Sequence, residues 1–85
     1  MYPLLKLSWL DIHTQDGWTT EKYLDAARCF TVGYLIDETN DFYIIAATVG
    51  YDSEDIDSHE YNQRICIPKG CVVLREELCT GEGCG

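Results

Sequence analysis

Apolar and polar residues alternate near the start of the chain. Over residues 4–12, Leu5, Leu7 and Trp9 fall in one register, and Lys6 and Ser8 fall in the other. A period of two is typical of a strand with one buried face. The pattern therefore predicts a first strand over residues 4–12, with its leucines in the core.

The next segment predicts a loop followed by a short helix. Residues 13–17 are polar and end in glycine, and Thr19 is then suited to cap a helix with Glu21 in the first turn. Trp18 before the cap and Tyr23 after it have the spacing of a hydrophobic staple. We expect this helix to run from residue 19 to about residue 27.

Two further apolar segments predict a β-hairpin. Residues 29–36 are β-branched and aromatic, as in a central strand, and Gly33 marks a bulge or a close backbone approach. Residues 37–41 have turn chemistry, and residues 42–51 resume the strand pattern. The two segments are therefore expected to pair.

The remaining chain predicts two more strands. Residues 51–60 are strongly acidic and are expected to form an exposed loop. Residues 61–67 read as a fourth strand, residues 68–70 as a tight Pro-Lys-Gly turn, and residues 71–74 as a short fifth strand. Residues 79–85, which contain only Cys, Thr, Gly and Glu, are expected to be a flexible tail.

This order of elements predicts a mainly β fold with one short helix. A long first loop, a hairpin, a fourth strand, a tight turn and a short closing strand make the plan of a small five-stranded SH3-like barrel, with the helix in the first long loop. A barrel protects edge strands that an open sheet would leave exposed. We expect residues 1–78 to form this single domain.

Composition and charge narrow the classes of partner. The chain has 85 residues, 46% of them hydrophobic, and a formal net charge of −9. So short a chain builds only one core, and we expect a homo-oligomer to supplement it. The negative charge disfavours generic nucleic-acid binding and favours a basic protein surface. No membrane-spanning segment or signal-peptide layout is present, so a cytoplasmic location is expected.

The cysteines do not predict a disulfide framework. Their number is five, which is odd, and no secretion signal accompanies them. Cys66 and Cys71, and likewise Cys79 and Cys84, are separated by four residues rather than the two of common zinc sites. A four-thiolate site would need the tail to fold back. We therefore expect mostly free thiols, with a disulfide in the tail as the alternative, and we assign no metal and no cofactor.

No catalytic centre is predicted. His13 and His59 are the only imidazoles, and both lie in polar segments without a nucleophile motif. The simpler interpretation is that both are solvated loop histidines. We therefore assign no catalytic residues and do not expect an enzyme.

One candidate binding feature is the acidic segment. Its carboxylates can imitate a phosphate backbone or occupy a basic site on another protein, although a dense acidic run is also the composition of a soluble loop. The candidate residues are Asp52, Glu54, Asp55 and Asp57.

The other candidate is a site for a small anionic ligand. Arg28 at the junction of helix and strand, and Lys69 in the tight turn, can each present a cation beside backbone N–H groups. Stacking surfaces are offered by Trp9, Trp18 and Tyr34. The simpler interpretation places these aromatic side chains in the core or the staple.

Several motifs resemble those of small uncharacterised accessory proteins from tailed phages. The resemblance covers residues 9 to about 78 and excludes the acidic segment and the tail. It is carried by Trp9-x-Asp11, Gly17-Trp18-Thr19, Thr31-Val32-Gly33-Tyr34-Leu35-Ile36, Ile45-Ala46-Ala47 and Ile67-Pro68-Lys69-Gly70-Cys71.

The resemblance implies a phage protein that works in the host bacterial cytoplasm by binding. It could block a host protein through its acidic surface, as counter-defence or host takeover. It could instead be an oligomer that sequesters a small anionic nucleotide signal, or a minor structural or assembly component of the virion.

Overall fold

Five strands make up nearly all of the regular structure in the computed structural model, which describes residues 2–52 and 55–79. The side chains of residues 51, 52 and 55–57 are not described. The elements are β1 (Leu4–Asp11), β2 (Ala27–Glu38), β3 (Phe42–Asp52), β4 (Asp55–Pro68), the 3-10 turn η1 (Lys69–Cys71) and β5 (Val72–Cys79). The prediction of a mainly β fold is confirmed.

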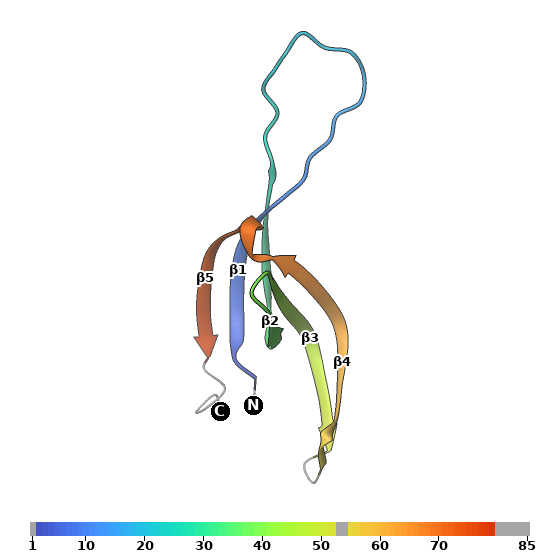
Figure 1. Ribbon diagram of the computed structural model, residues 1–85, viewed down its shortest axis with the longest axis vertical. Helices are drawn as coiled ribbons and strands as arrows, with labels where there is room; N and C mark the ends of the chain where they lie inside the picture. Colours follow the sequence, from blue (N-terminus) through green and yellow to red (C-terminus); the bar gives the residue numbers. More distant parts are fainter. Residues whose placement is uncertain (1, 53–54, 80–85) are drawn as a thin grey trace.

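The strands form one antiparallel sheet in the order β4-β3-β2-β1-β5 (Figure 1). β5 returns to lie beside β1, while β4 stays beside β3 at the opposite edge. A closed barrel would need these two edges to pair, and no pairing between described residues joins them. The sheet is therefore open, and the expected closure is not observed.

The core lies around β1. Leu5 and Leu7 are fully buried, as their alternation predicts, and they pack with Ile45 of β3 and Ile67 of β4. Partly buried side chains surround this cluster, namely Trp9, Leu35, Tyr43, Ile65 and Val72. The indole N–H of Trp9 donates to Thr31 Oγ1 at 2.9 Å, so the polar group of this large side chain is satisfied. Trp9 is thus a core residue.

The helix predicted in the first long loop is absent. Residues 12–26, here called the arm, have no regular secondary structure and are exposed throughout (Figure 1). Thr19 Oγ1 accepts the N–H of Glu21 at 3.1 Å, as a helix cap would, but no helix follows. A helix of about nine residues is marginal in water unless an apolar face packs on the fold, and the arm projects away from the sheet.

Most of the acidic segment belongs to β-strands, and not to the exposed loop that its charge predicts. The β3–β4 hairpin continues through it, with Asp52 paired opposite Asp55 near the tip. Residues 55–60 therefore belong to β4, because backbone pairing with β3 continues through them, with an irregularity between Gly50 and Asp52. The fifth strand is also longer than predicted and ends at Cys79.

These projections make the molecule elongated. Its radius of gyration is 16.7 Å and its extents are 61 × 23 × 22 Å. A compact domain of this length would have a radius of gyration of about 12 Å. The arm and the β3–β4 hairpin extend from opposite ends of the sheet (Figure 1).

Gly33 fills the role expected of it, a close approach of two backbones. A Cβ atom at this position of β2 would lie 2.5 Å from Ile45 Cγ2 and 2.8 Å from the carbonyl oxygen of Ala46. The backbone oxygen cannot move without disturbing the β2–β3 pairing, in which Tyr34 lies opposite Ala46. Only glycine fits here. The bulge of β2 lies farther along the strand, between Leu35 and Asp37.

We therefore expect Gly33→Ala to lower the free energy of unfolding by about 1–3 kcal/mol, the range for overpacking a core. Urea unfolding followed by circular dichroism measures this change. Gly50→Ala in β3 is the matched control, because a Cβ at Gly50 meets nothing within 4 Å. Equal stability of Gly33→Ala and Gly50→Ala would contradict the proposed steric restriction.

Candidate functional site

The arm presents the most exposed apolar surface of the described residues. Trp18 is 105% exposed and Tyr23 is 81% exposed, and Ile12 and Leu24 are also exposed. Large aromatic side chains are normally needed inside so small a domain. The staple predicted between Trp18 and Tyr23 has no helix to support it, because the arm is not helical. Both rings are exposed and are available to a partner.

The two ends of the arm are held together at its base, whereas the rest of the arm projects away from the sheet. Asp11 and Ala27 are the last paired residues of β1 and β2, and His13 Nδ1 donates to the carbonyl oxygen of Asp25 at 2.9 Å. His13 is exposed, as predicted. The arm is a loop closed at its base by backbone pairing.

The charge of the arm suits a basic partner. It carries Asp16, Glu21 and Asp25 against the single cation of Lys22. All four side chains are exposed. Aromatic rings and carboxylates thus alternate along one projecting segment, and these are groups that can contact Lys and Arg side chains.

The residues predicted to bind an anionic ligand are not brought together as one site. Arg28 is exposed at the start of β2, and its guanidinium has no ion-pair partner among the described residues. Tyr34 is half-buried six residues later in the same strand, roughly 20 Å away along the strand axis. Trp18 lies out in the arm.

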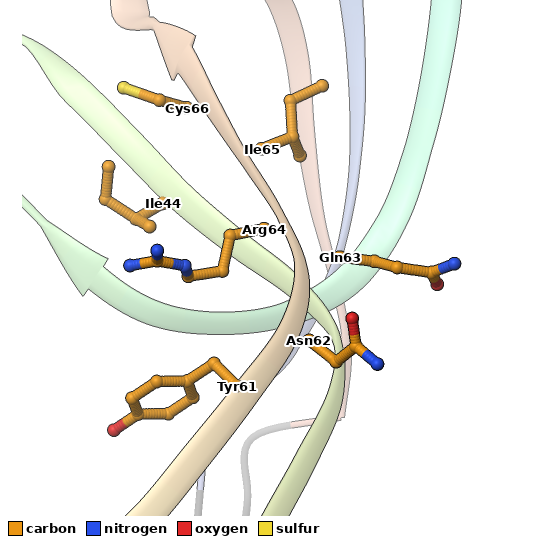
Figure 2. Close-up of a pocket in the computed structure, with 7 residues that line it drawn as sticks. All are labelled: Ile44, Tyr61, Asn62, Gln63, Arg64, Ile65 and Cys66. Atoms are coloured by element: carbon orange, nitrogen blue, oxygen red, sulfur yellow. The ribbon is translucent and has the colours of Figure 1, made fainter.

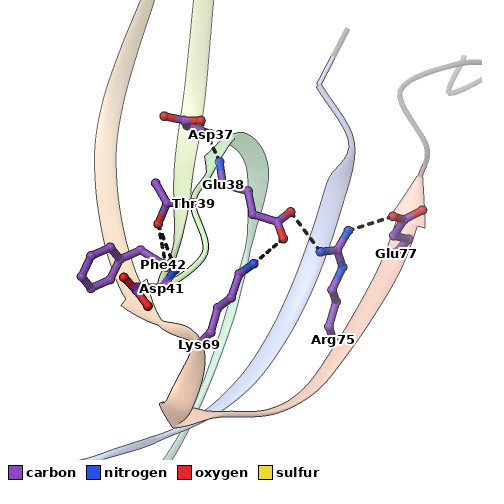
Figure 3. Close-up of polar contacts among 8 residues, drawn as sticks. All are labelled: Asp37, Glu38, Thr39, Asp41, Phe42, Lys69, Arg75 and Glu77. Carbon is purple, nitrogen blue, oxygen red and sulfur yellow. Dashed lines mark hydrogen bonds and ion pairs between the residues drawn. The ribbon is translucent and has the colours of Figure 1, made fainter.

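Lys69 is held by a carboxylate of its own chain, that of Glu38 (Figure 3). Its Nζ lies 2.7 Å from Glu38 Oε2, and Arg75 lies 3.3 Å from Glu38 Oε1 and 3.1 Å from Glu77 Oε1. Both cations also lie over the ring of Tyr43, at 5.1 Å and 5.5 Å from its centroid. The backbone N–H of Lys69 donates to the carbonyl of Asp41 at 2.8 Å. This network joins η1 and β5 to the β2–β3 turn.

The pKa of Glu38 is lowered by its hydrogen bond to Lys69 and further by the charges of Lys69 and Arg75. A carboxyl whose pKa is lower in the folded chain stabilises the fold above its ordinary pKa of 4.5, and this contribution is lost as the pH falls through the lowered value. The network is partly exposed, so its contribution is modest.

We expect Glu38→Gln to lower the free energy of unfolding by roughly 0.2–1 kcal/mol at pH 7, and the difference from the parent chain to vanish below the lowered pKa. Thermal unfolding between pH 3 and pH 7 measures it. Glu60→Gln removes the same charge from an exposed residue without an ion pair in the described part. An equal loss in both variants would show that the network contributes nothing.

The predicted acidic site is only partly described. Asp52 ends β3, while Asp55 and Asp57 lie in β4, which places their backbones at the tip of the hairpin. Glu54 lies outside the described residues. The backbone thus gathers three of the four predicted carboxylate residues at one end of the molecule.

A polar hollow along β4 was not found by sequence reasoning. It has a volume of about 500 Å³ and is open to solvent (Figure 2); its lining is Ile44, Tyr61, Asn62, Gln63, Arg64, Ile65 and Cys66. Gln63 has a φ of 55°, a left-handed conformation that residues other than Gly, Asn and Asp rarely adopt. In Figure 2 the side chains of Tyr61 and Arg64 point away from those of Asn62 and Gln63. Nothing in the local sequence signals this break in alternation.

A second polar cluster holds the start of the chain to β4. The hydroxyl of Tyr2 lies 2.7 Å from the hydroxyl of Tyr61 and 3.0 Å from His59 Nδ1. The hydrogen bond with Tyr61 and the accompanying desolvation raise the pKa of Tyr2. His59 is therefore a half-buried strand residue, and the prediction of a solvated loop histidine is wrong for it.

The thiols form no metal site in the described part of the chain, where no group of three or more Cys, His, Asp or Glu side chains converges. Cys29, Cys66 and Cys71 are free thiols, as expected. Cys79 is disulfide-bonded and is thus an exception to the mostly free thiols expected. Cys84 lies outside the described residues.

Comparison with known proteins adds no relative, because no family model, curated protein or solved structure matches this chain. Within the described residues, no helix has the length and apolar character needed to span a membrane. The arm, the β4 hollow and the hairpin tip are thus the features from which a function must be inferred.

Proposed function

We propose that this protein acts without catalysis, by binding a basic surface of another protein and blocking it. The observation that supports this most strongly is the arm, a 15-residue projecting segment whose Trp18 and Tyr23 are 105% and 81% exposed. Tyr and Trp are the residues most enriched among those that dominate binding energy at protein interfaces. Leaving them in water has no benefit for the stability of the isolated domain.

Charge supports a basic partner. The net charge of −9 speeds the approach of a positively charged protein, and the carboxylates of the arm and of the hairpin tip can fix its orientation. The arm and the hairpin tip extend from opposite ends of the sheet, so we assign the main contact to the arm (Figure 1).

The biological setting of the proposal comes from the resemblance to small tailed-phage proteins. In that setting the protein works in the host bacterial cytoplasm, and the blocked protein belongs to the host. The proposed role is counter-defence or host takeover.

For the fold, we infer an open variant of the SH3-like plan. The support is the order of its parts: a long loop after β1, a tight β2–β3 turn, and a 3-10 turn between β4 and β5 that returns the chain to β1.

The arm is tested by affinity capture from host lysate, with bound proteins quantified by mass spectrometry, followed by titration of the purified partner. We expect Trp18→Ala to weaken the complex by about 30-fold or more, the loss of an interface residue worth about 2 kcal/mol. Raising the salt concentration should weaken it further.

Phe30→Ala is the matched control, because Phe30 is an aromatic residue that is 61% exposed on β2 rather than on the arm. It should leave the complex intact. A partner that binds the parent chain and Trp18→Ala equally well would contradict the role of the arm.

A second function, sequestration of a small anionic nucleotide, is favoured by the hollow along β4. Tyr61 offers an aromatic face, Asn62 and Gln63 offer amide groups, and Arg64 offers a cation without an ion pair among the described residues. These are the groups that recognise a base and a phosphate.

This alternative predicts a rise in melting temperature with one nucleotide from a panel of linear, cyclic and ADP-ribose nucleotides. Arg64→Ala should abolish the rise. The same measurement on Arg28→Ala and Lys69→Ala shows whether the two cations predicted from sequence contribute to nucleotide binding. An unchanged melting temperature with every nucleotide at millimolar concentration would exclude sequestration at this hollow.

A further inference from the structure

Both outer strands leave backbone groups unpaired along one side. β4 pairs with β3 alone and β5 with β1 alone, among the described residues. Unpaired N–H and C=O groups at a sheet edge favour pairing with another chain, and proteins that stay monomeric protect such edges with Lys, Pro or a covering segment. β5 contains neither Lys nor Pro.

β5 carries charged side chains, but they do not cover its apolar ones. Val73, Leu74 and Leu78 are half exposed, although they belong to an eight-residue strand at the edge. Arg75 and Glu77 neutralise each other at 3.1 Å. Glu76 is then the only charged side chain of β5 without an ion pair in the described residues.

The β4 edge has complementary properties. Its hollow of about 500 Å³ is lined by Ile44 and Ile65 as well as by polar side chains, so it can receive a side chain of β5. Arg64 is the only charged residue in this lining and has no ion pair among the described residues. This stretch of β4 therefore complements Glu76 of β5 in charge.

The core is small, which indicates that the exposed apolar side chains are covered when several copies assemble. Only Leu5, Leu7, Ile45, Ala46 and Ile67 form the buried apolar set, whereas eleven large apolar side chains in the described part are exposed. A core of this size rarely stabilises a domain by itself. Every chain carries both a β4 and a β5 edge, so a second copy supplies the complement of each.

We propose that the β5 edge of one copy pairs with the β4 edge of a second copy, head to tail. Pairing of two β5 edges, or of two β4 edges, would lack the attraction between Glu76 and Arg64 and would leave the hollow without side chains of β5. Because a head-to-tail contact leaves one free edge at each end, it repeats, and three or more chains assemble into a ring or a filament. The arm is not needed for this contact, so the proposal stands apart from the proposed role of the arm, whereas it fills the hollow that nucleotide sequestration would use.

Light scattering after size-exclusion chromatography tests the assembly. At micromolar concentration we expect a mass of at least three chains of 9.7 kDa for the parent protein, and of one chain for Val73→Lys. Val32→Lys is the matched control, because Val32 is 52% exposed like Val73 but lies on an inner strand of the sheet, opposite Lys6 of β1. It should retain the assembly. A monomeric or dimeric parent, or equal behaviour of the two variants, overturns the proposal.

Cross-linking identifies the edges in contact, since Cys66 is an exposed free thiol on β4. One protein keeps Cys66, and a second carries Cys66→Ser with Leu74→Cys or, to sample the other face of β5, with Val73→Cys. On mild oxidation we expect disulfide-linked dimers only when the two proteins are mixed.

Dimers in either protein alone would mean pairing of like edges and would overturn the head-to-tail contact. The absence of cross-links for both β5 positions would overturn it as well. Cys66→Ser alone controls for the remaining thiols, and circular dichroism of each variant checks that the sheet is retained.

Discussion

The pairing of β1 on both of its sides is the constraint on which the rest of the structure depends. β2 and β5 both pair with this strand, and its Leu5 and Leu7 are fully buried. Since the first strand of the chain pairs with both the second and the last, the sheet is complete only when β5 makes its non-local contact with β1. β3 follows β2 through a short turn at residues 39–41, whereas η1 leads the chain from β4 at one edge to β5 at the other.

The same arrangement explains why the arm is free. β1 and β2 are neighbours, yet 15 residues separate them, many more than a hairpin turn requires. The surplus chain has no sheet face to cover and projects with its aromatic residues in water. A loop that is anchored at its base and variable in its contacts is a common place for binding residues.

The negative charge of the chain opposes association of its copies, whereas the exposed strand edges favour it. The net charge of −9 keeps copies of the chain apart at long range, whereas the unpaired backbone and apolar side chains of β5 favour contact at short range. Salt bridges within the chain, such as those of Glu38, pair cations with carboxylates at the surface and leave the net charge unchanged. Copies of the chain therefore bind one another only where strand edges pair and the unpaired charges that meet have opposite signs.

The sequence by itself determined the strand content, the burial of Leu5 and Leu7, the turn at 37–41 and the close approach at Gly33, because each depends on alternation, turn chemistry or side-chain size within a short stretch. Tertiary structure decided the rest. The cap at Thr19 forms without a helix, the acidic residues 55–60 join β4, Lys69 pairs with Glu38, and Gln63 breaks the alternation that would have revealed the hollow. Each of these outcomes depends on which distant segment supplies a partner, and local pattern does not contain that information.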